Sequence, residues 1–150
     1  MTASRQPPAA SVREGETALA IDPATLAGDA HVVFIGQIRT PWETRKDCPK
    51  NPREARERGQ TATLQLDPAY RQGLTGLGGY SHILVLYWMH EARRDLVLQS
   101  PAHIKEPRGV FALRSPVRPN PIGLDVVKLV AIDHAAGVLT IDATDCLDGT

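Results

Sequence analysis

Two arginines and one asparagine are set among prolines between residues 114 and 121. Arg114, Arg118 and Asn120 are interleaved with prolines at positions 116, 119 and 121. Each proline fixes its own φ and restricts the residue before it, so these polar side chains lose little freedom on binding a ligand. Guanidinium groups held in this way suit a carboxylate or a phosphate. The stretch predicts a stiff anion-binding loop, although a rigid connection with arginines covering apolar surface would look the same.

The histidines do not predict a metal site. His82 and His90 fall on one face of an apolar run over residues 81–90, which is typical of a β-strand. At ~3.3 Å per residue, an extended strand separates them by about 26 Å, so they cannot share an ion. A third ligand such as His103 or Cys146 would not change this distance. We therefore expect no metal.

Charge is unevenly distributed along a chain whose formal net charge is zero. Residues 31–60 carry seven Lys/Arg against four Asp/Glu, an excess of +3, and residues 101–130 carry five against two, again +3. Residues 131–150 carry four Asp and no Lys or Arg. Two cationic stretches are compatible with binding a polyanion, because phosphate attraction depends on local charge. They are equally compatible with solvated surface segments.

Length and composition favour one globular domain outside the membrane. The chain has 150 residues, of which 42% are hydrophobic and 23% charged. The longest apolar run, residues 83–89, is too short to cross a bilayer, and the first residues lack the apolar core of a signal peptide. We expect a cytoplasmic protein without membrane contact. Its two cysteines, Cys48 and Cys146, form no CxxC pair and should be reduced thiols.

The elements that must position these residues are mostly short strands. Residues 1–28 resemble a flexible tail that buries little, and residues 29–150 form the domain. A polar, basic loop over 43–60 includes a possible helical turn at 52–58, and a second turn is expected at 68–74. The run at 81–90, apolar on both faces, should be a central strand, and Gly137 suits a hairpin turn. Strands are predicted at 32–38, 61–66, 81–90, 110–113, 123–132 and 138–144.

This arrangement predicts a mainly β protein: a single small antiparallel β-barrel with few short helices. No internal repeat is visible. No glycine-rich dinucleotide fingerprint occurs, which disfavours a doubly wound methyltransferase fold.

The segment GVFALRSPVRPNPIGL at 109–124 resembles the signature of the TsaA-like (TrmO) family of S-adenosylmethionine-dependent tRNA methyltransferases. Three further segments agree with the family and occur in its order: IGQIRTPW at 35–42, GYSH at 79–82 with the strand that follows, and DCLDGT at 145–150. The resemblance covers residues 32–150.

The resemblance implies an antiparallel β-barrel that is usually a homodimer and binds S-adenosylmethionine. The family's reaction is methylation of the exocyclic nitrogen of threonylcarbamoyl-adenosine, next to the anticodon of tRNA. Family members continue beyond the position of Thr150, so we expect the cofactor pocket to be incomplete in this chain. By matching motifs, the cofactor-binding residues would be Pro52, Arg53, Glu54, His90, Glu91, Arg114, Leu124, Leu147, Asp148, Gly149 and Thr150.

Each of these residue types suits S-adenosylmethionine. Arg114 would hold the carboxylate, and Glu91 or Asp148 would meet the ammonium or the sulfonium. Gly149 would permit close backbone approach. Methyl transfer is an in-line displacement, in which positioning supplies up to ~7–11 kcal/mol. His90 and Asp148 are the candidates for a weak general base.

We expect tRNA to be bound by basic residues of the first basic loop, together with one arginine of the proline-rich loop. They are Arg45, Lys46, Lys50, Arg56, Arg58 and Arg118. Two other functions fit the same residues: methylation of another RNA or of a small molecule, or a non-catalytic nucleotide-binding module of the same fold.

Overall fold

The computed structural model describes residues 11–26, 28, 30–102 and 104–150, and the chain divides into two compact units. Unit 1 combines the N-terminal segment up to Asp29 with Met89–Ile122, and unit 2 combines Ala30–Trp88 with Gly123–Thr150. Residues 1–10, 27 and 29 of the sequence, and His103, lie outside the described residues. In the described part of the chain, no helix has the length and apolar character needed to cross a membrane.

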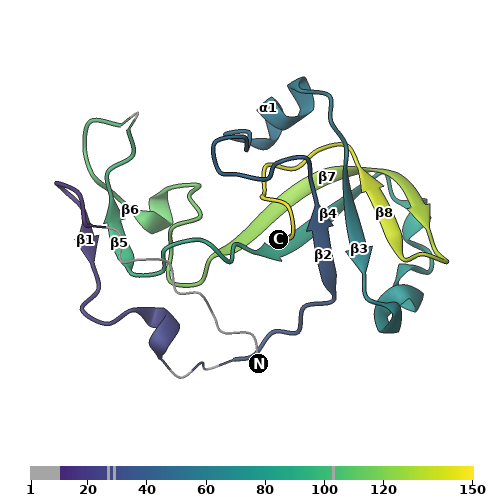
Figure 1. Ribbon diagram of the computed structural model, residues 1–150, viewed down its shortest axis with the longest axis horizontal. Helices are drawn as coiled ribbons and strands as arrows, with labels where there is room; N and C mark the ends of the chain where they lie inside the picture. Colours follow the sequence, from purple (N-terminus) through teal and green to yellow (C-terminus); the bar gives the residue numbers. More distant parts are fainter. Residues whose placement is uncertain (1–10, 27, 29, 103) are drawn as a thin grey trace. The chain divides into compact units, whose positions relative to one another are not determined.

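Unit 2 is built on a five-stranded sheet with the order β2-β3-β8-β7-β4 (Figure 1). Its strands are β2 (Gly36–Arg39), β3 (Ala62–Leu66), β4 (His82–Trp88), β7 (Ile122–Asp133, with Ile122 in unit 1) and β8 (Val138–Ile141). The β2–β3, β3–β8 and β7–β8 pairs are antiparallel, and the sheet curls into a half-barrel. Gly137 closes the β7–β8 hairpin with φ of 71°, as expected. The prediction of a mainly β, antiparallel fold with few short helices is confirmed.

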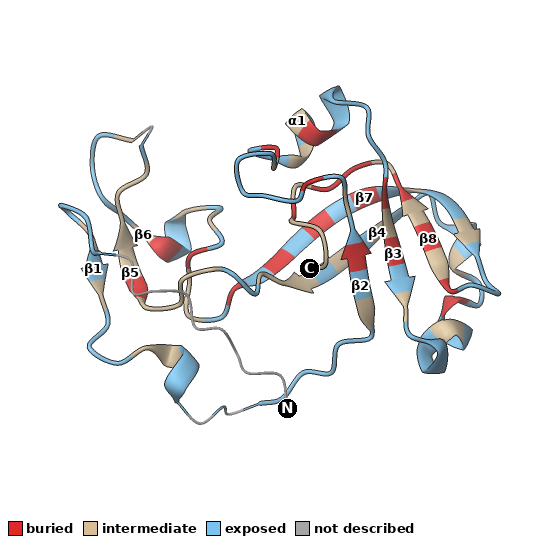
Figure 2. Cartoon of the chain, in the orientation of Figure 1, coloured by how far each residue is buried: buried red, intermediate tan, exposed pale blue. Residues whose placement is uncertain are grey.

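The inner face of this sheet forms the core of unit 2. Residues alternate along each strand between the two faces, and buried positions therefore recur at every second residue of β3 and β7 (Figure 2). In β7 the inward series is Gly123, Asp125 and Val127, while Leu124 and Val126 point outward. The buried core residues are Ile38, Ala62, Leu64, Leu74, Val127, Leu139, Ile141 and Cys146.

Strand β4 is an edge strand, so the expectation that it is central is wrong. The expectation rested on apolar residues on both faces. The structure shows that one of these faces is not covered: Leu84 is 69% exposed and Leu86 is 72% exposed. Apolarity on both faces has two possible causes, a central position or an uncovered outer face, and the sequence pattern is the same for both.

Short helices connect the strands of unit 2. Helix α1 (Pro52–Glu57) begins where expected, because Pro52 occupies its first turn and the Asn51 side chain accepts a hydrogen bond from the Glu54 N–H at 2.9 Å. The predicted turn at 68–74 is the 3-10 helix η2 (Pro68–Leu74), followed by η3 (Leu77–Gly79).

Unit 1 contains a three-stranded sheet with the order β1-β5-β6, in which β5 is central. Its strands are β1 (Thr17–Ala18), β5 (Leu96–Gln99) and β6 (Arg108–Gly109), with the 3-10 helices η1 (Pro23–Thr25) and η4 (Val110–Ala112). The sequence region expected to be a tail thus supplies β1 and η1. The strand expected at 110–113 is wrong: Val110 is fully buried and Phe111 is 84% exposed within a single helical turn. A run of four apolar residues is too short to reveal its period.

Candidate functional site

The last residues of unit 2 are held against the end of β2. The Ile38 N–H donates to the Thr150 carbonyl at 2.7 Å, and the Gly149 N–H donates back to the Ile38 carbonyl at 2.9 Å. The Asp148 N–H donates to the Trp42 carbonyl, also at 2.9 Å. Four residues of the expected cofactor set, 147–150, therefore have a fixed backbone.

The Asp148 carboxylate also takes part in holding this segment. One oxygen accepts the Thr40 N–H at 3.0 Å, and the other lies 3.4 Å from Arg39 Nη1. Gly149 has φ of 76°, and a Cβ there would come only within 3.6 Å of Arg39 Nη1. Glycine is thus required at 149 by the left-handed backbone, and close packing does not demand it.

Trp42 connects the C-terminal segment to the basic loop. Its indole N–H donates to the Thr144 carbonyl at 3.0 Å, and the side chain is buried. The Arg58 guanidinium lies 5.1 Å from the centroid of its ring, within the range of a cation–π contact. Sequence reasoning did not assign Trp42 a role. The available signal was a large aromatic residue at the start of an otherwise polar loop.

A buried polar pair lies beneath this segment. The Thr144 hydroxyl donates to the Asp125 carboxylate at 2.7 Å, and Asp125 is only 2% exposed. Its neighbour Leu124, from the expected cofactor set, points to the other face and is 53% exposed. A Cβ at Gly123 would lie 2.2 Å from the Tyr87 ring, so the glycine of the proline-rich motif is required by packing. Sequence reasoning missed Asp125, whose signal was an acidic residue at an inward position of an alternating strand.

The remaining unit 2 members of the cofactor set lie in α1. Glu54 accepts the Lys50 N–H at 3.0 Å and the Arg58 guanidinium at 2.5 Å. These two hydrogen bonds, the first the larger in effect, hold the pKa of Glu54 below its usual value. Arg53 pairs with Glu57 at 2.9 Å with its side chain 88% exposed. Pro52 and Glu54 therefore shape the start of the helix, and Arg53 points to solvent.

Burial makes Cys146 a poor nucleophile. Desolvation raises the pKa of this thiol to about 12, and burial also raises the pKa of Cys48. At pH 8 a thiol with that pKa is about one part in 10⁴ thiolate, against roughly a quarter for an ordinary cysteine. We expect Cys146 to react with iodoacetamide about a thousand times more slowly in the native protein than in 6 M guanidinium. Mass spectrometry of the labelled peptides measures both rates, and equal rates would contradict the burial of this thiol.

In unit 1, arginines hold the proline-rich loop. Arg118 donates from Nε to the Ser115 carbonyl at 2.9 Å and from Nη2 to the Leu113 carbonyl at 2.8 Å. Arg94 Nε donates to the Pro119 carbonyl at 2.6 Å. The guanidinium of Arg118 is thus engaged with the backbone of its own loop. The prediction that Arg118 binds RNA therefore concerns a side chain that already has intramolecular partners. Arg114 is exposed on the same loop.

His90 and Glu91 lie in a turn that adjoins the end of this loop. The Ala92 N–H closes the turn on the Met89 carbonyl at 3.0 Å, and the Met89 N–H donates to the Pro121 carbonyl at 2.9 Å. Both side chains are exposed. All three unit 1 members of the cofactor set, including Arg114, are therefore attached to one braced loop.

The basic residues expected to bind RNA divide into two groups. Arg56 donates from Nε to Asp142 at 2.8 Å and from Nη2 to the Val126 carbonyl at 3.0 Å, and Arg58 donates to the Asp47 carbonyl at 2.5 Å. Burial is the largest single influence on the pKa of Asp142 and raises it, but the hydrogen bonds from Arg56 and the Lys128 N–H, together with the Arg56 charge, lower the pKa overall. These two arginines hold α1 and its loop in place.

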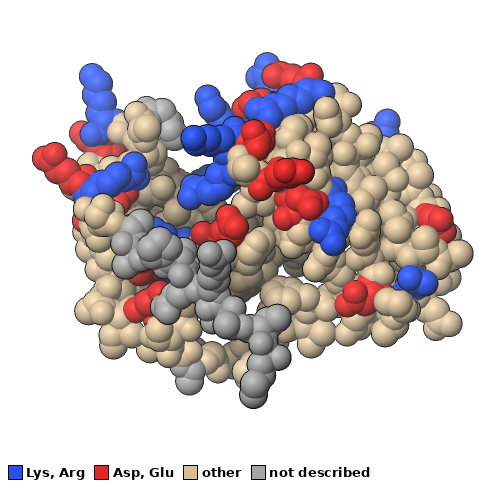
Figure 3. All heavy atoms as spheres, in the orientation of Figure 1, with Lys and Arg blue, Asp and Glu red and all other residues tan. Residues whose placement is uncertain are grey.

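The other group consists of Arg45, Lys46 and Lys50. All three are exposed, and none of them takes part in an ion pair within the described part of the chain. Basic and acidic side chains are intermingled over α1 and its surroundings (Figure 3). The surface is therefore not uniformly positive, and these three residues are the ones available for phosphate contacts.

A polar hollow of about 250 Å³ occurs elsewhere in unit 2, beside β2, β3 and the β7–β8 hairpin. It contains none of the residues of the expected cofactor set, and Arg71 at its wall donates to the Ala135 carbonyl at 2.9 Å. Its lining residues are Gln37, Gln65, Leu66, Asp67, Arg71, Ala136 and Val138. The hollow and the unit 2 members of the expected cofactor set are therefore different parts of unit 2.

Comparison with known proteins identifies relatives over most of the chain. Residues 37–150 match the model of the tRNA-methyltransferase O N-terminal domain. A probable S-adenosyl-L-methionine-binding protein, VirR of Rhizobium radiobacter, is 42% identical over 139 residues, which are 93% of this chain and 75% of that protein. The tRNA (adenine(37)-N6)-methyltransferase of Escherichia coli K12 is 32% identical over 124 residues.

Solved structures agree with the sequence relatives. The crystal structure of TrmO from Pseudomonas aeruginosa superposes with a TM-score of 0.61 at 33% identity, over 80% of this chain and 51% of that one. The match to the Escherichia coli enzyme covers 77% of this chain and 52% of the enzyme. The chain therefore spans about half the length of these two relatives.

Proposed function

The chain belongs to the tRNA-methyltransferase O family, and from that premise we propose that it binds S-adenosylmethionine and methylates tRNA. The proposed target is the exocyclic nitrogen of threonylcarbamoyl-adenosine next to the anticodon, in the cytoplasm. The observation that carries this proposal is the proline-rich loop braced by Arg118 and Arg94. Arg114 stands at its start, and the turn with His90 and Glu91 is bonded to its end at Pro121. A loop of this kind is preorganised for an amino-acid ligand with a carboxylate and an ammonium.

Different residues would recognise different parts of the cofactor. Arg114 would pair with the carboxylate through two parallel N–H donors, and Glu91 would accept from the ammonium. In unit 2, the fixed backbone of 147–150 and the start of α1 would contribute Leu147, Asp148, Gly149, Thr150, Pro52, Arg53 and Glu54. Leu124 would supply apolar contact. S-adenosylmethionine itself supplies the activated methyl group, and the protein's contribution is to fix its direction relative to the nitrogen.

Of the two candidates for proton removal, the geometry favours His90. The Asp148 carboxylate already accepts the Thr40 N–H and lies beside Arg39, so protonating it would weaken the contacts that hold the C-terminal segment. His90 is exposed, and neither ring nitrogen is assigned to a hydrogen bond within the described residues. We expect His90→Ala to lower kcat with little change in the dissociation constant of the cofactor. Asp148→Asn should instead weaken cofactor binding.

We also propose that the protein is a homodimer that uses the outer face of β4 and β7. Leu84, Leu86, Leu124 and Val126 lie on this face, each more than half exposed. Exposed apolar patches on a folded surface commonly mark an interface, and β4 and β7 are neighbours in the sheet.

The double variant Leu84→Asp, Leu86→Asp should be a monomer, because a charge on each side chain cannot be desolvated in an apolar interface. Sedimentation velocity measures the mass, with Tyr70→Asp on η2 as the matched surface change. An unchanged sedimentation coefficient in the double variant would place the interface elsewhere.

Two measurements test the proposed function against its alternatives. Isothermal titration with S-adenosylmethionine separates a methyltransferase from a nucleotide-binding module that uses another ligand. Methyl transfer from labelled cofactor onto bulk tRNA, prepared with and without the threonylcarbamoyl group, identifies the substrate. Transfer only to the modified tRNA is the expected result. Equal transfer to both, or transfer to a small molecule alone, would replace the proposed substrate.

A further inference from the structure

The N-terminal segment of unit 1 is docked on the strand that supports the proline-rich loop. The family match begins at residue 37, so this segment lies outside it. We propose that residues 13–19, and Glu16 above all, position the proline-rich loop and thereby Arg114. As far as the cofactor is concerned, this inference rests on the proposed function.

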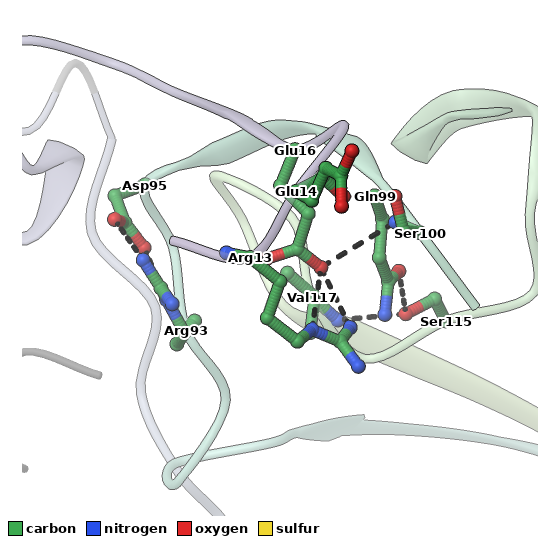
Figure 4. A network of polar contacts seen from close by, with 9 residues as sticks. All are labelled: Arg13, Glu14, Glu16, Arg93, Asp95, Gln99, Ser100, Ser115 and Val117. Atoms are coloured by element: carbon green, nitrogen blue, oxygen red, sulfur yellow. Dashed lines mark hydrogen bonds and ion pairs between the residues drawn. The ribbon is translucent and has the colours of Figure 1, made fainter. Parts of the chain in front are cut away.

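Glu16 is the anchor of the segment. Its side chain is only 1% exposed, although it is a carboxylate. Oε1 accepts Arg13 Nη2 at 2.6 Å and Nε at 3.1 Å, Oε2 accepts the Arg13 N–H at 3.1 Å, and the Ser100 N–H lies 3.4 Å from Oε1 (Figure 4). The Arg13 side chain holds the pKa of Glu16 below its usual value despite burial. Arg13 thus neutralises the carboxylate from within the segment, and the Ser100 N–H joins it to the residue that directly follows β5.

The rest of the segment follows β5 closely. Thr17 pairs with Leu98 in the sheet, and the Leu19 N–H donates to the Asp95 carbonyl at 2.7 Å. The Ser100 hydroxyl donates to the Glu14 carbonyl at 3.1 Å. At Gly15, φ is 78° and a Cβ would lie 2.8 Å from the Pro107 side chain, so only glycine fits.

Strand β5 also contacts the proline-rich loop, through its last residue, Gln99. Gln99 precedes Ser100, and its Oε1 accepts the Ser115 hydroxyl at 2.8 Å (Figure 4). Ser115 in turn accepts the Val117 N–H at 3.2 Å, and Val117 is buried. Ser115 directly follows Arg114. Gln99 at the end of β5 and Ser100 directly after it thus connect the Glu16 carboxylate to the loop.

Loss of β1 should destabilise the sheet that holds the proline-rich loop. β5 is the central strand of the order β1-β5-β6, and its pairing with β6 consists of Leu98 with Gly109 and Gln99 with Arg108. An isolated pair of strands is marginally stable, whereas a third strand makes a sheet that can persist. Without β1 the pair would fray, and Arg114 would lose fixed direction before it met its ligand.

The experiment compares Glu16→Gln with Glu14→Gln in the full chain. Glu14 is the matched control, because it is exposed and only its backbone carbonyl is used. Amide hydrogen exchange of residues 108–118, measured without cofactor, should rise by about 5–30-fold in Glu16→Gln and remain unchanged in Glu14→Gln. Glu16→Asp, which keeps the charge, should restore part of the protection. Equal exchange in both glutamine variants would overturn the proposal.

A double-mutant cycle with Arg114→Ala tests whether Glu16 acts through the loop. Glu16→Gln should weaken S-adenosylmethionine binding by about 5–30-fold in the natural background and by less than about 2-fold when Arg114 is already alanine. If the two substitutions weaken binding independently, so that their fold-changes multiply, Glu16 does not act through Arg114. If Glu16→Gln does not fold, Ser115→Ala at the other end of the connection should give the same pattern. If the natural protein binds no S-adenosylmethionine, the proposed function fails, and hydrogen exchange still decides the role of Glu16.

Discussion

Replacing Arg114 with alanine should weaken S-adenosylmethionine binding by about 10–150-fold, since a hydrogen-bonded contact to a charged group is worth about 1.5–3 kcal/mol. The loop around Arg114 is braced by Arg118 and Arg94, so the side chain meets its ligand at a small entropic cost. Arg114→Lys should fall between the natural protein and the alanine variant, because an ammonium keeps the charge but cannot form two parallel hydrogen bonds. Isothermal titration measures all three dissociation constants.

Lys105→Ala provides the control for Arg114. Lys105 belongs to the same unit and is also exposed, so its loss tests whether any positive charge in unit 1 has the same effect. We expect its dissociation constant to equal that of the natural protein. If Arg114→Ala binds as well as Lys105→Ala, Arg114 is not a cofactor ligand, and the braced loop has another purpose.

Replacing Arg45 and Lys46 with alanine should weaken tRNA binding without changing cofactor binding. Both side chains are exposed and unpaired among the described residues, so they can reach phosphates. Two exposed ionic contacts are worth up to about 1 kcal/mol each, which amounts to about 30-fold in affinity at low salt. The slope of log affinity against log salt should become shallower by about 2, one for each lost phosphate contact. Fluorescence anisotropy with labelled tRNA across a salt series gives both quantities.

Arg56→Ala is the matched comparison in the same region. Because Arg56 bridges Asp142 and the Val126 carbonyl, its loss should lower the melting temperature and leave the salt slope nearly unchanged. A parallel loss of slope in Arg56→Ala would show that this arginine leaves its intramolecular partners to bind RNA. No change of slope for Arg45 and Lys46 would move the RNA contact to another surface.

Local sequence signals predicted those parts of the fold that neighbouring residues decide. Asn51 and Pro52 start α1 through contacts within one turn, and Gly137 adopts the backbone that its hairpin requires. Alternation along 61–66 and 123–132 identified β3 and most of β7. The motifs that resemble the family likewise needed no knowledge of tertiary contacts.

Contacts between distant residues were beyond the reach of such signals. Arg56 and Asp142 are 86 residues apart, and the donor role of Arg118 depends on how its loop turns back on itself. Both arginines looked like phosphate ligands in the sequence, because the sequence does not distinguish an arginine that has an intramolecular partner from one that has none. Asp125 was overlooked since its partner, Thr144, lies on another segment.

The sequence by itself determined the family, the antiparallel β character and the residues that start and end the turns, because these follow from spacing and from the backbone limits of proline, glycine and asparagine. The tertiary structure decided which charges are used internally, that β4 lies at an edge, and that residues 13–19 pack on β5. The physical reason is that pairing and burial depend on which segments meet after folding. Segments of equal polarity and propensity meet or remain apart according to the packing of the whole unit.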